Sequence, residues 1–201
     1  MAGNNFNLSQ DKKSFDDAAI KKAITSILKA IGEDPAREGL AKTPKRVAEM
    51  YAELFYGIQS DPAEELTTGF EEGHREMVII RDIPFYSMCE HHLLPFYGVT
   101  HIGYVPNEKG RVVGASKLAK VVEIVARRLQ LQERMTTQIA EAIVKGIQPD
   151  GVGVVIHAEH LCMFMRGIKK PGSAVVTSAV RGIFRSNSKT RSEFFSLIQG
   201  K

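Results

Sequence analysis

Residues 116–147, SKLAKVVEIVARRLQLQERMTTQIAEAIVKGI, decide the fold because they contain two helical patterns in direct succession. We expect Ser116 to cap the first helix. Its apolar face consists of Leu118, Val121, Val122, Val125 and Leu129. The apolar face of the second consists of Met135, Ile139, Ala142, Ile143 and Ile147. Pro149-Asp150-Gly151 then ends the second helix, so the sequence predicts a pair of helices, each with one buried face.

Strand patterns lie on both sides of this helix pair. The expected strands are 77–80, 96–105 and 111–113 before it, and 153–156, 174–176 and 183–184 after it, with a terminal helix around 194–198. Strands at both ends with paired helices between them favour an antiparallel sheet covered on one face. We therefore predict an α+β fold and not a doubly wound one.

The N-terminal part has a different pattern. Residues 1–14 are polar, and we expect a flexible N-terminus there. One helix should start at Ser14 and Asp17 and end at Gly32; another should begin with Thr43 as its cap and close at Gly57. The polar segment 60–73 resembles a linker, so we place a boundary near residue 73. This gives an N-terminal helical region, 15–73, and a second domain, 74–201.

Composition limits the class of protein. The chain has 201 residues, of which 43% are hydrophobic and 25% charged, typical of a globular protein. We find no apolar run near the roughly 20 residues that cross a bilayer, and the polar start does not resemble a signal peptide. We therefore expect a cytoplasmic protein with no membrane partner. A net charge of +4 is too small to indicate nucleic acid binding.

Both cysteines and three of the six histidines lie in two short segments, Cys89-Glu90-His91-His92 and His160-Leu161-Cys162. Two cysteines cannot form a disulfide framework, and in a reducing compartment such thiols are more often metal ligands or catalytic groups. The C-x-x-H step of Cys89 and His92 suits zinc, and Cys162 would be the third ligand. Three ligands leave a fourth position for water, as in catalytic zinc sites.

The spacing leaves two other interpretations open. The cysteines could be ordinary core residues, because free cysteine often behaves as a small hydrophobe. Alternatively, His91 or His160 could complete a closed Cys2His2 structural site.

Four motifs together identify a resemblance. They are Cys-Glu-His-His (89–92), Gly-Ala-Ser-Lys-Leu-Ala-Lys (114–120), Gln-Glu-Arg-Met-Thr (132–136) and His-Leu-Cys-Met-Phe-Met-Arg-Gly (160–167). In this order the chain resembles the GTP cyclohydrolase I family from about residue 15 to its C-terminal end. The resemblance implies a zinc-dependent hydrolase that converts GTP into 7,8-dihydroneopterin 3'-triphosphate and formate, the first step of tetrahydrofolate or related pterin biosynthesis.

The resemblance also implies an architecture. The fold would be a tunnelling fold, with residues 74–201 as the catalytic domain. Its subunits would close into a homo-oligomer, a decamer of two pentameric rings with the sites at subunit interfaces. Allosteric control is possible in such an assembly.

The catalytic roles that the resemblance implies fall on the two cysteine and histidine segments. The zinc ligands would be Cys89, His92 and Cys162, the set that the spacing also suggests. His91 would protonate or hydrogen-bond N7 of guanine while bound water attacks C8, and His160 would assist proton transfer. Adjacent side chains on a strand point to opposite faces, so the segment with His91 and His92 should be a turn.

Substrate recognition is implied for residues of the other motifs. Glu133 would bind the guanine edge, which presents N–H donors, and Gln132 would be a further substrate contact. The triphosphate contacts would be Ser116, Lys117, Lys120 and Arg166. Arg46 would come from a neighbouring subunit. Three residues further on, where some relatives have a basic residue, this chain has Glu49, so that phosphate contact is in doubt or shifts to Lys45.

Two alternative functions remain at this stage. A zinc hydrolase of another purine nucleotide would keep the metal ligands and could lose Glu133 or the cations. A zinc-stabilised binding module would use the metal for folding alone, and chelation would unfold it without any catalytic activity being lost.

Overall fold

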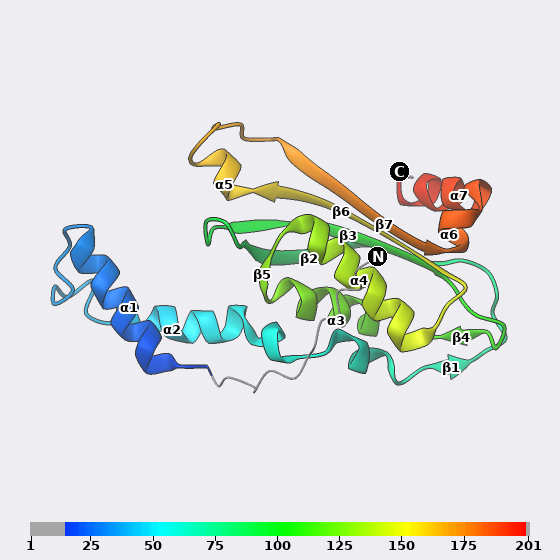
Figure 1. Ribbon diagram of the computed structural model, residues 1–201, viewed down its shortest axis with the longest axis horizontal. Helices are drawn as coiled ribbons and strands as arrows, with labels where there is room; N and C mark the ends of the chain where they lie inside the picture. Colours follow the sequence, from blue (N-terminus) through cyan, green and yellow to red (C-terminus); the bar gives the residue numbers. More distant parts are fainter. Residues whose placement is uncertain (1–14, 200–201) are drawn as a thin grey trace, which may run out of the picture. The chain divides into compact units, whose positions relative to one another are not determined.

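The computed structural model describes residues 15–199, and the chain divides into two compact units, 1–54 and 55–201. The first unit contains α1 (Asp17–Ala30) and α2 (Thr43–Leu54), which pack against each other (Figure 1). Asp16 caps α1 by accepting a hydrogen bond from the backbone N–H of Ala19, whereas Ser14 lies outside the described residues. Gly32, with φ of 88°, follows the end of α1 as predicted.

The second unit begins earlier than the boundary we expected near residue 73. Two 3-10 helices, η1 (Tyr56–Gln59) and η2 (Pro62–Leu66), belong to it. Leu66 is fully buried and packs beside Gly146, where an added Cβ would lie 2.6 Å from the Leu66 Cβ. Gly57 does not close α2, which ends at Leu54. Gly57 lies in η1 instead, and a Cβ there would be only 2.0 Å from the carbonyl oxygen of Ile124.

A five-stranded sheet forms the centre of the second unit, in the order β5-β2-β3-β6-β7. The strands are β2 (Val78–Cys89), β3 (Pro95–Val105), β5 (Leu129–Gln130), β6 (Gly151–His160) and β7 (Ala174–Gly182). All neighbours are antiparallel except β5 and β2. A small second sheet pairs β1 (Phe70–Glu71) with β4 (Arg111–Val112). Mainly antiparallel strands with segregated helices confirm the α+β class.

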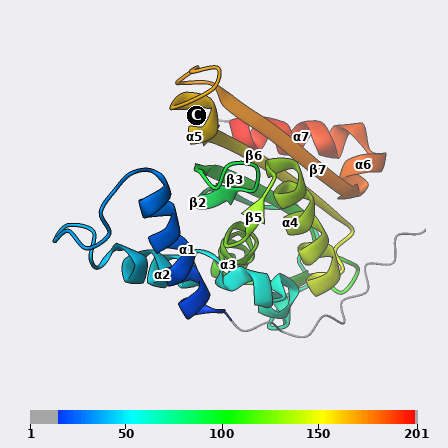
Figure 2. The ribbon, with the colours of Figure 1, turned by 60° about the vertical axis from the view of Figure 1, so that its left-hand side comes forward.

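The predicted helix pair covers one face of the sheet (Figures 1 and 2). Its helices are α3 (Ala115–Ala126) and α4 (Gln132–Ile147). The main core lies between them and the sheet and includes Leu118, Val121, Val125, Met135, Ile139, Ile143, Ile102, Val154 and Ile156. Two details of the prediction were wrong. Ser116 does not cap α3, because the helix begins at Ala115 and its cap is Gly114, two residues before Ser116. Leu129 belongs to β5 and not to α3.

The C-terminal segment covers part of the opposite face. The prediction of a strand at 183–184 was wrong, because β7 ends at Gly182, whose φ of 57° turns the chain into α6 (Ile183–Ser186). The terminal helix α7 (Ser188–Gln199) follows and is longer than expected. Phe184 and Phe194 are fully buried there and pack with Val155 of β6 in a second core cluster. None of the helices among residues 15–199 has the length and apolarity needed to span a membrane.

Candidate functional site

Three metal-binding side chains meet at one end of the sheet. Cys89 is the last residue of β2, His92 lies in the following turn, and Cys162 is on the short helix α5 (Leu161–Phe164). One potential ligand atom of each lies within 4.8 Å of the others. The segment that contains His91 and His92 is a turn, as predicted.

Backbone pairing brings these two distant segments together. Cys89 donates its N–H to the carbonyl of Leu94 at 2.9 Å and accepts from the N–H of Leu93 at 2.9 Å, which closes the turn before β3. At the start of β3, Phe96 is paired with His160 at the end of β6. Cys162 follows His160 by two residues, so the strand register itself places it beside the turn.

The surroundings of the Cys162 thiol are suited to a bound cation. Cys89 is buried, and burial together with the neighbouring Cys89 thiol raises the pKa of Cys162. The Cys162 thiol therefore resists ionisation unless a positive charge lies beside it, and a bound metal ion deprotonates such a thiol. A set of two sulfur donors and one imidazole is suited to zinc and leaves a fourth position open. These residues therefore fit a zinc ion.

An ion pair holds the metal-binding turn against α4. Glu90 receives two hydrogen bonds from the guanidinium of Arg134, at 2.5 and 2.8 Å. The same arginine lowers the pKa of the Glu90 carboxyl through these hydrogen bonds. The backbone N–H of Glu90 also donates to the carbonyl of Gln130 in β5, at 3.1 Å. The turn is thus fixed to α4 by side chains and to β5 by the backbone.

His160 lies beside the metal-binding residues in a half-buried setting. Its ring stacks on Phe96, with centroids 4.6 Å apart and planes 2° from parallel. Its Nε2 is 2.8 Å from Oε1 of Gln132, the first residue of α4. Burial lowers the pKa of His160, and the negative charge of Glu133 opposes that shift. The predicted second histidine therefore belongs to the same end of the sheet as the thiols.

The remaining predicted residues at this end are exposed. The ring of His91 is 6.2 Å from that of His92, and both residues are exposed. Glu133 is exposed in the first turn of α4. Arg166 extends to His92, with its Nη1 3.0 Å from Nε2. Exposed acidic, basic and imidazole groups around a metal-binding set can contact a polar, anionic substrate.

The predicted triphosphate residues on α3 are not at this end. Ser87 donates its hydroxyl to the carbonyl of Ala126 at 2.7 Å, which places the last turn of α3 near the cysteine end of β2. Ser116 precedes Ala126 by ten residues, a helical rise of about 15 Å. Within one chain, Ser116 and Lys117 therefore lie at the far end of α3 from the metal-binding set. Arg46 is exposed on α2, in the other unit.

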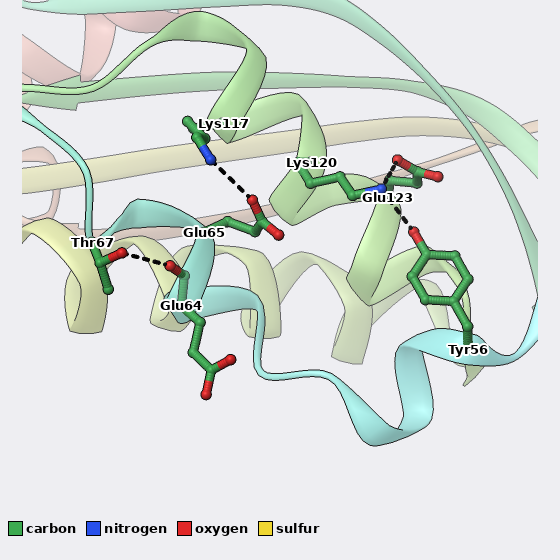
Figure 3. A network of polar contacts seen from close by, with 7 residues as sticks. All are labelled: Tyr56, Glu64, Glu65, Thr67, Lys117, Lys120 and Glu123. Carbon is green, nitrogen blue, oxygen red and sulfur yellow. Dashed lines mark hydrogen bonds and ion pairs between the residues drawn. The ribbon is translucent and has the colours of Figure 1, made fainter.

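The two lysines of α3 are paired with acidic groups in the same chain (Figure 3). Nζ of Lys117 lies 3.3 Å from the carboxylate of Glu65 on η2. Nζ of Lys120 lies 2.9 Å from Glu123 and 3.3 Å from the hydroxyl of Tyr56, and these hydrogen bonds raise the pKa of Lys120. A cavity of about 430 Å³ lies between β2 and α3 and includes Ser116, Lys120 and Glu123 in its lining. An anion that binds here must compete with these carboxylates.

Several contacts of the site were missed from the sequence. The pair of Glu90 and Arg134 could have been suspected, because each lies within a motif that already stood out and their charges are opposite. The stacking of Phe96 on His160 and the contact of Thr177 with Gln132 depend on strand register and had no sequence signal.

The site combines a Cys-His-Cys set with a second histidine and exposed charged groups. On an α+β fold, this combination indicates a metal-dependent enzyme. A family profile described as GTP cyclohydrolase I matches residues 20–199. The GTP cyclohydrolase 1 of Dehalococcoides mccartyi is 68% identical over 187 residues, which cover 93% of this chain and 99% of the relative. That of Pelotomaculum thermopropionicum is 62% identical, and the match covers 93% of this chain and 99% of the relative. That of Geobacillus kaustophilus is 59% identical, and the match covers 90% of this chain and 96% of the relative. The chain belongs to the GTP cyclohydrolase I family and is an enzyme of that type.

A solved structure of an archaeosine synthase QueF-like protein in the apo form is also similar. Its TM-score is 0.44 at 19% identity, and the match covers 53% of this chain and 93% of that one. This likeness is too weak to carry an argument about the fold.

Proposed function

We propose that this chain opens the imidazole ring of GTP at C8 by hydrolysis, releasing formate and forming 7,8-dihydroneopterin 3'-triphosphate. This is the first step of tetrahydrofolate or related pterin biosynthesis. The observation that carries the proposal is the convergence of Cys89, His92 and Cys162 within 4.8 Å, beside His160. Family membership supports GTP as the substrate.

Cys89, His92 and Cys162 would hold zinc. When bound, zinc supplies a water acidic enough to react near neutral pH. His91 is exposed next to this set and hydrogen-bonds or protonates N7, which makes C8 more electrophilic. His160 holds and moves a proton as the rings open. Glu133 accepts hydrogen bonds from N1–H and the exocyclic amine of guanine.

The triphosphate end of the site would be completed by another copy of the chain. The α3 residues lie about 9 to 15 Å along the helix from the metal-binding end, so one chain does not bring them together with it. We propose that Ser116, Lys117 and Lys120 act with the metal-binding end of a neighbour, to which Arg166 contributes. Arg46 would come from a neighbouring subunit. Lys45 is paired with Glu49 at 3.7 Å, so no second basic contact from α2 is proposed.

The sheet suggests how copies associate. Among residues 15–199, β7 pairs with β6 alone, so its other edge is available for a strand of a second copy. Repeated pairing of this kind would close copies with the tunnelling fold into a ring, and two pentameric rings would form a decamer. Residues 74–201 would be the catalytic domain. The two free cysteines are consistent with a reducing, cytoplasmic location.

Zinc content and formate release test the proposal together. Purified protein should contain zinc and release formate from GTP, and Cys162→Ala should lose both. His157→Ala is the matched control, because His157 is an exposed histidine on β6 away from the metal-binding set, and it should keep both. Full turnover in metal-free Cys162→Ala would refute the mechanism.

The same protein separates the alternatives. Chelated protein that stays folded but stops releasing formate has a catalytic metal, whereas protein that unfolds on chelation has a structural one. Formate released from another purine nucleotide but not from GTP would favour the related hydrolase.

A further inference from the structure

Gln132 is expected as a substrate contact, but its side chain is enclosed by protein. The residue is 2% exposed at the start of α4. Its Nε2 lies 3.2 Å from the carbonyl oxygen of Ile156 and 2.9 Å from that of Val175. Its Oε1 lies 2.8 Å from Nε2 of His160. Both ends of the amide are thus already engaged.

These partners fix which end of the amide faces His160. Carbonyl oxygens only accept hydrogen bonds, so the amide nitrogen must face Ile156 and Val175. A flipped amide would bring its oxygen against two carbonyl oxygens. The amide oxygen therefore faces His160 and can only accept, so Nε2 of His160 must carry the hydrogen.

A short chain of hydroxyls independently supports this orientation. Thr136 donates its hydroxyl to the backbone carbonyl of Gln132 at 2.7 Å. Its oxygen must therefore accept from the hydroxyl of Thr177, which is 2.6 Å away. The Thr177 oxygen is then free to accept from Nε2 of Gln132 at 3.2 Å. Because the Thr177 hydrogen is already given to Thr136, an amide oxygen here would face the Thr177 oxygen with no hydrogen between them, so the amide nitrogen of Gln132 must face Thr177.

We propose that Gln132 is a positioning residue that holds His160 in the tautomer protonated at Nε2, so that Nδ1 exchanges the proton with the substrate. This inference rests on the proposed function for its catalytic part. In the reaction, Nδ1 accepts a proton in one step and returns it in a later one, and the Nε2–H stays bonded to Gln132. Stacking on Phe96 keeps the ring plane fixed during both steps.

The tautomer can be observed directly, without a variant. Nitrogen-15 NMR of histidine-labelled, zinc-loaded protein at about pH 8, where an ordinary histidine is neutral, should show His160 protonated at Nε2. The His160 signal is assigned by its loss in His160→Gln. A His160 protonated at Nδ1 in the wild-type protein would overturn the proposal.

Variants separate positioning from substrate contact. Gln132→Met removes the acceptor and should shift His160 towards a mixture of tautomers, with kcat reduced about 10-fold or more and KM for GTP changed little. Of the Gln132 amide, Thr177 contacts only the nitrogen, which faces away from His160. Thr177→Val should therefore leave the tautomer of His160 unchanged.

Two further results would count against the proposal. One is a raised KM with unchanged kcat in Gln132→Met, which is the signature of a substrate contact. The other is an unchanged tautomer in that variant. Failure of the proposed function would look different: wild-type protein would release no formate from GTP although His160 showed the expected tautomer.

Discussion

Mixing two inactive variants should restore activity if each site draws on two chains. The structure separates the metal-binding end from Lys117 by about 14 Å of helix within one chain. His91→Ala removes an exposed residue of the metal-binding end, and Lys117→Glu reverses a charge at the start of α3. Each variant alone should be inactive and folded, because both side chains are at least partly exposed.

The expected recovery follows from counting. A shared site is intact when its metal-binding end comes from a Lys117→Glu chain, which keeps His91. Its α3 residues must then come from a His91→Ala chain, which keeps Lys117. In a random equal mixture about a quarter of the sites meet this condition, so about a quarter of wild-type formate release should return. If each chain carried a whole site, no mixed site would contain both intact residues, and recovery would be absent.

A second mixture provides the control. Here both substitutions are placed in the same chain, which is mixed equally with wild-type chain. If sites are shared between chains, about a quarter of them stay intact. If each site lies within one chain, about half of them stay intact. Native mass spectrometry of differently tagged chains verifies exchange. No recovery in the first mixture, together with half activity in the second, would refute sharing between chains.

Three other changes test single contacts. Glu90→Gln breaks the two-point pair with Arg134 and should weaken zinc binding about 10- to 100-fold, measured by chelator competition; unchanged affinity would contradict the role of the pair. Phe194→Ala should lower the free energy of unfolding by about 3–5 kcal/mol, because its ring is fully buried, and a loss under about 1 kcal/mol in urea titration would disprove it. Burial lowers the pKa of His101, although the nearby Asp82 carboxylate opposes this shift. The backbone N–H of Asp82 donates to Nδ1 of His101 at 3.2 Å. Since the unfolded chain then takes up its proton at higher pH than the folded chain, stability should fall as pH drops below about 6.5, and His101→Gln should flatten this slope.

Periodicity was sufficient to predict the helix pair and most of the sheet. The apolar positions of residues 116–147 recur at helical spacing, and nearly all of them are buried as expected. The prediction for Leu129 failed because this residue has to serve two patterns. Leu129 continues the apolar spacing of α3, but the chain must leave the helix there so that β5 can pair with Met88 and Cys89. That pairing depends on β2, which lies about 40 residues earlier.

The metal-binding set could be predicted because its chemistry is carried by rare residue types. Only two cysteines are present, and the spacing of Cys89 and His92 already suits one ion. The role of Gln132 could not be predicted in this way. Glutamine is common on helix surfaces, and its burial follows from the packing of α4 against β6 and β7, which no local pattern contains.

The first turn of α4 is where fold and site are joined. Successive helical residues point in directions about 100° apart, so one turn faces several partners at once. Gln132 contacts His160, Arg134 binds Glu90, and Met135 is fully buried in the main core. A displacement of this turn would therefore move the histidine and the metal-binding turn together. Because the core residue fixes the helix, loss of packing at Met135 should reduce catalysis even though its side chain touches none of the reacting groups.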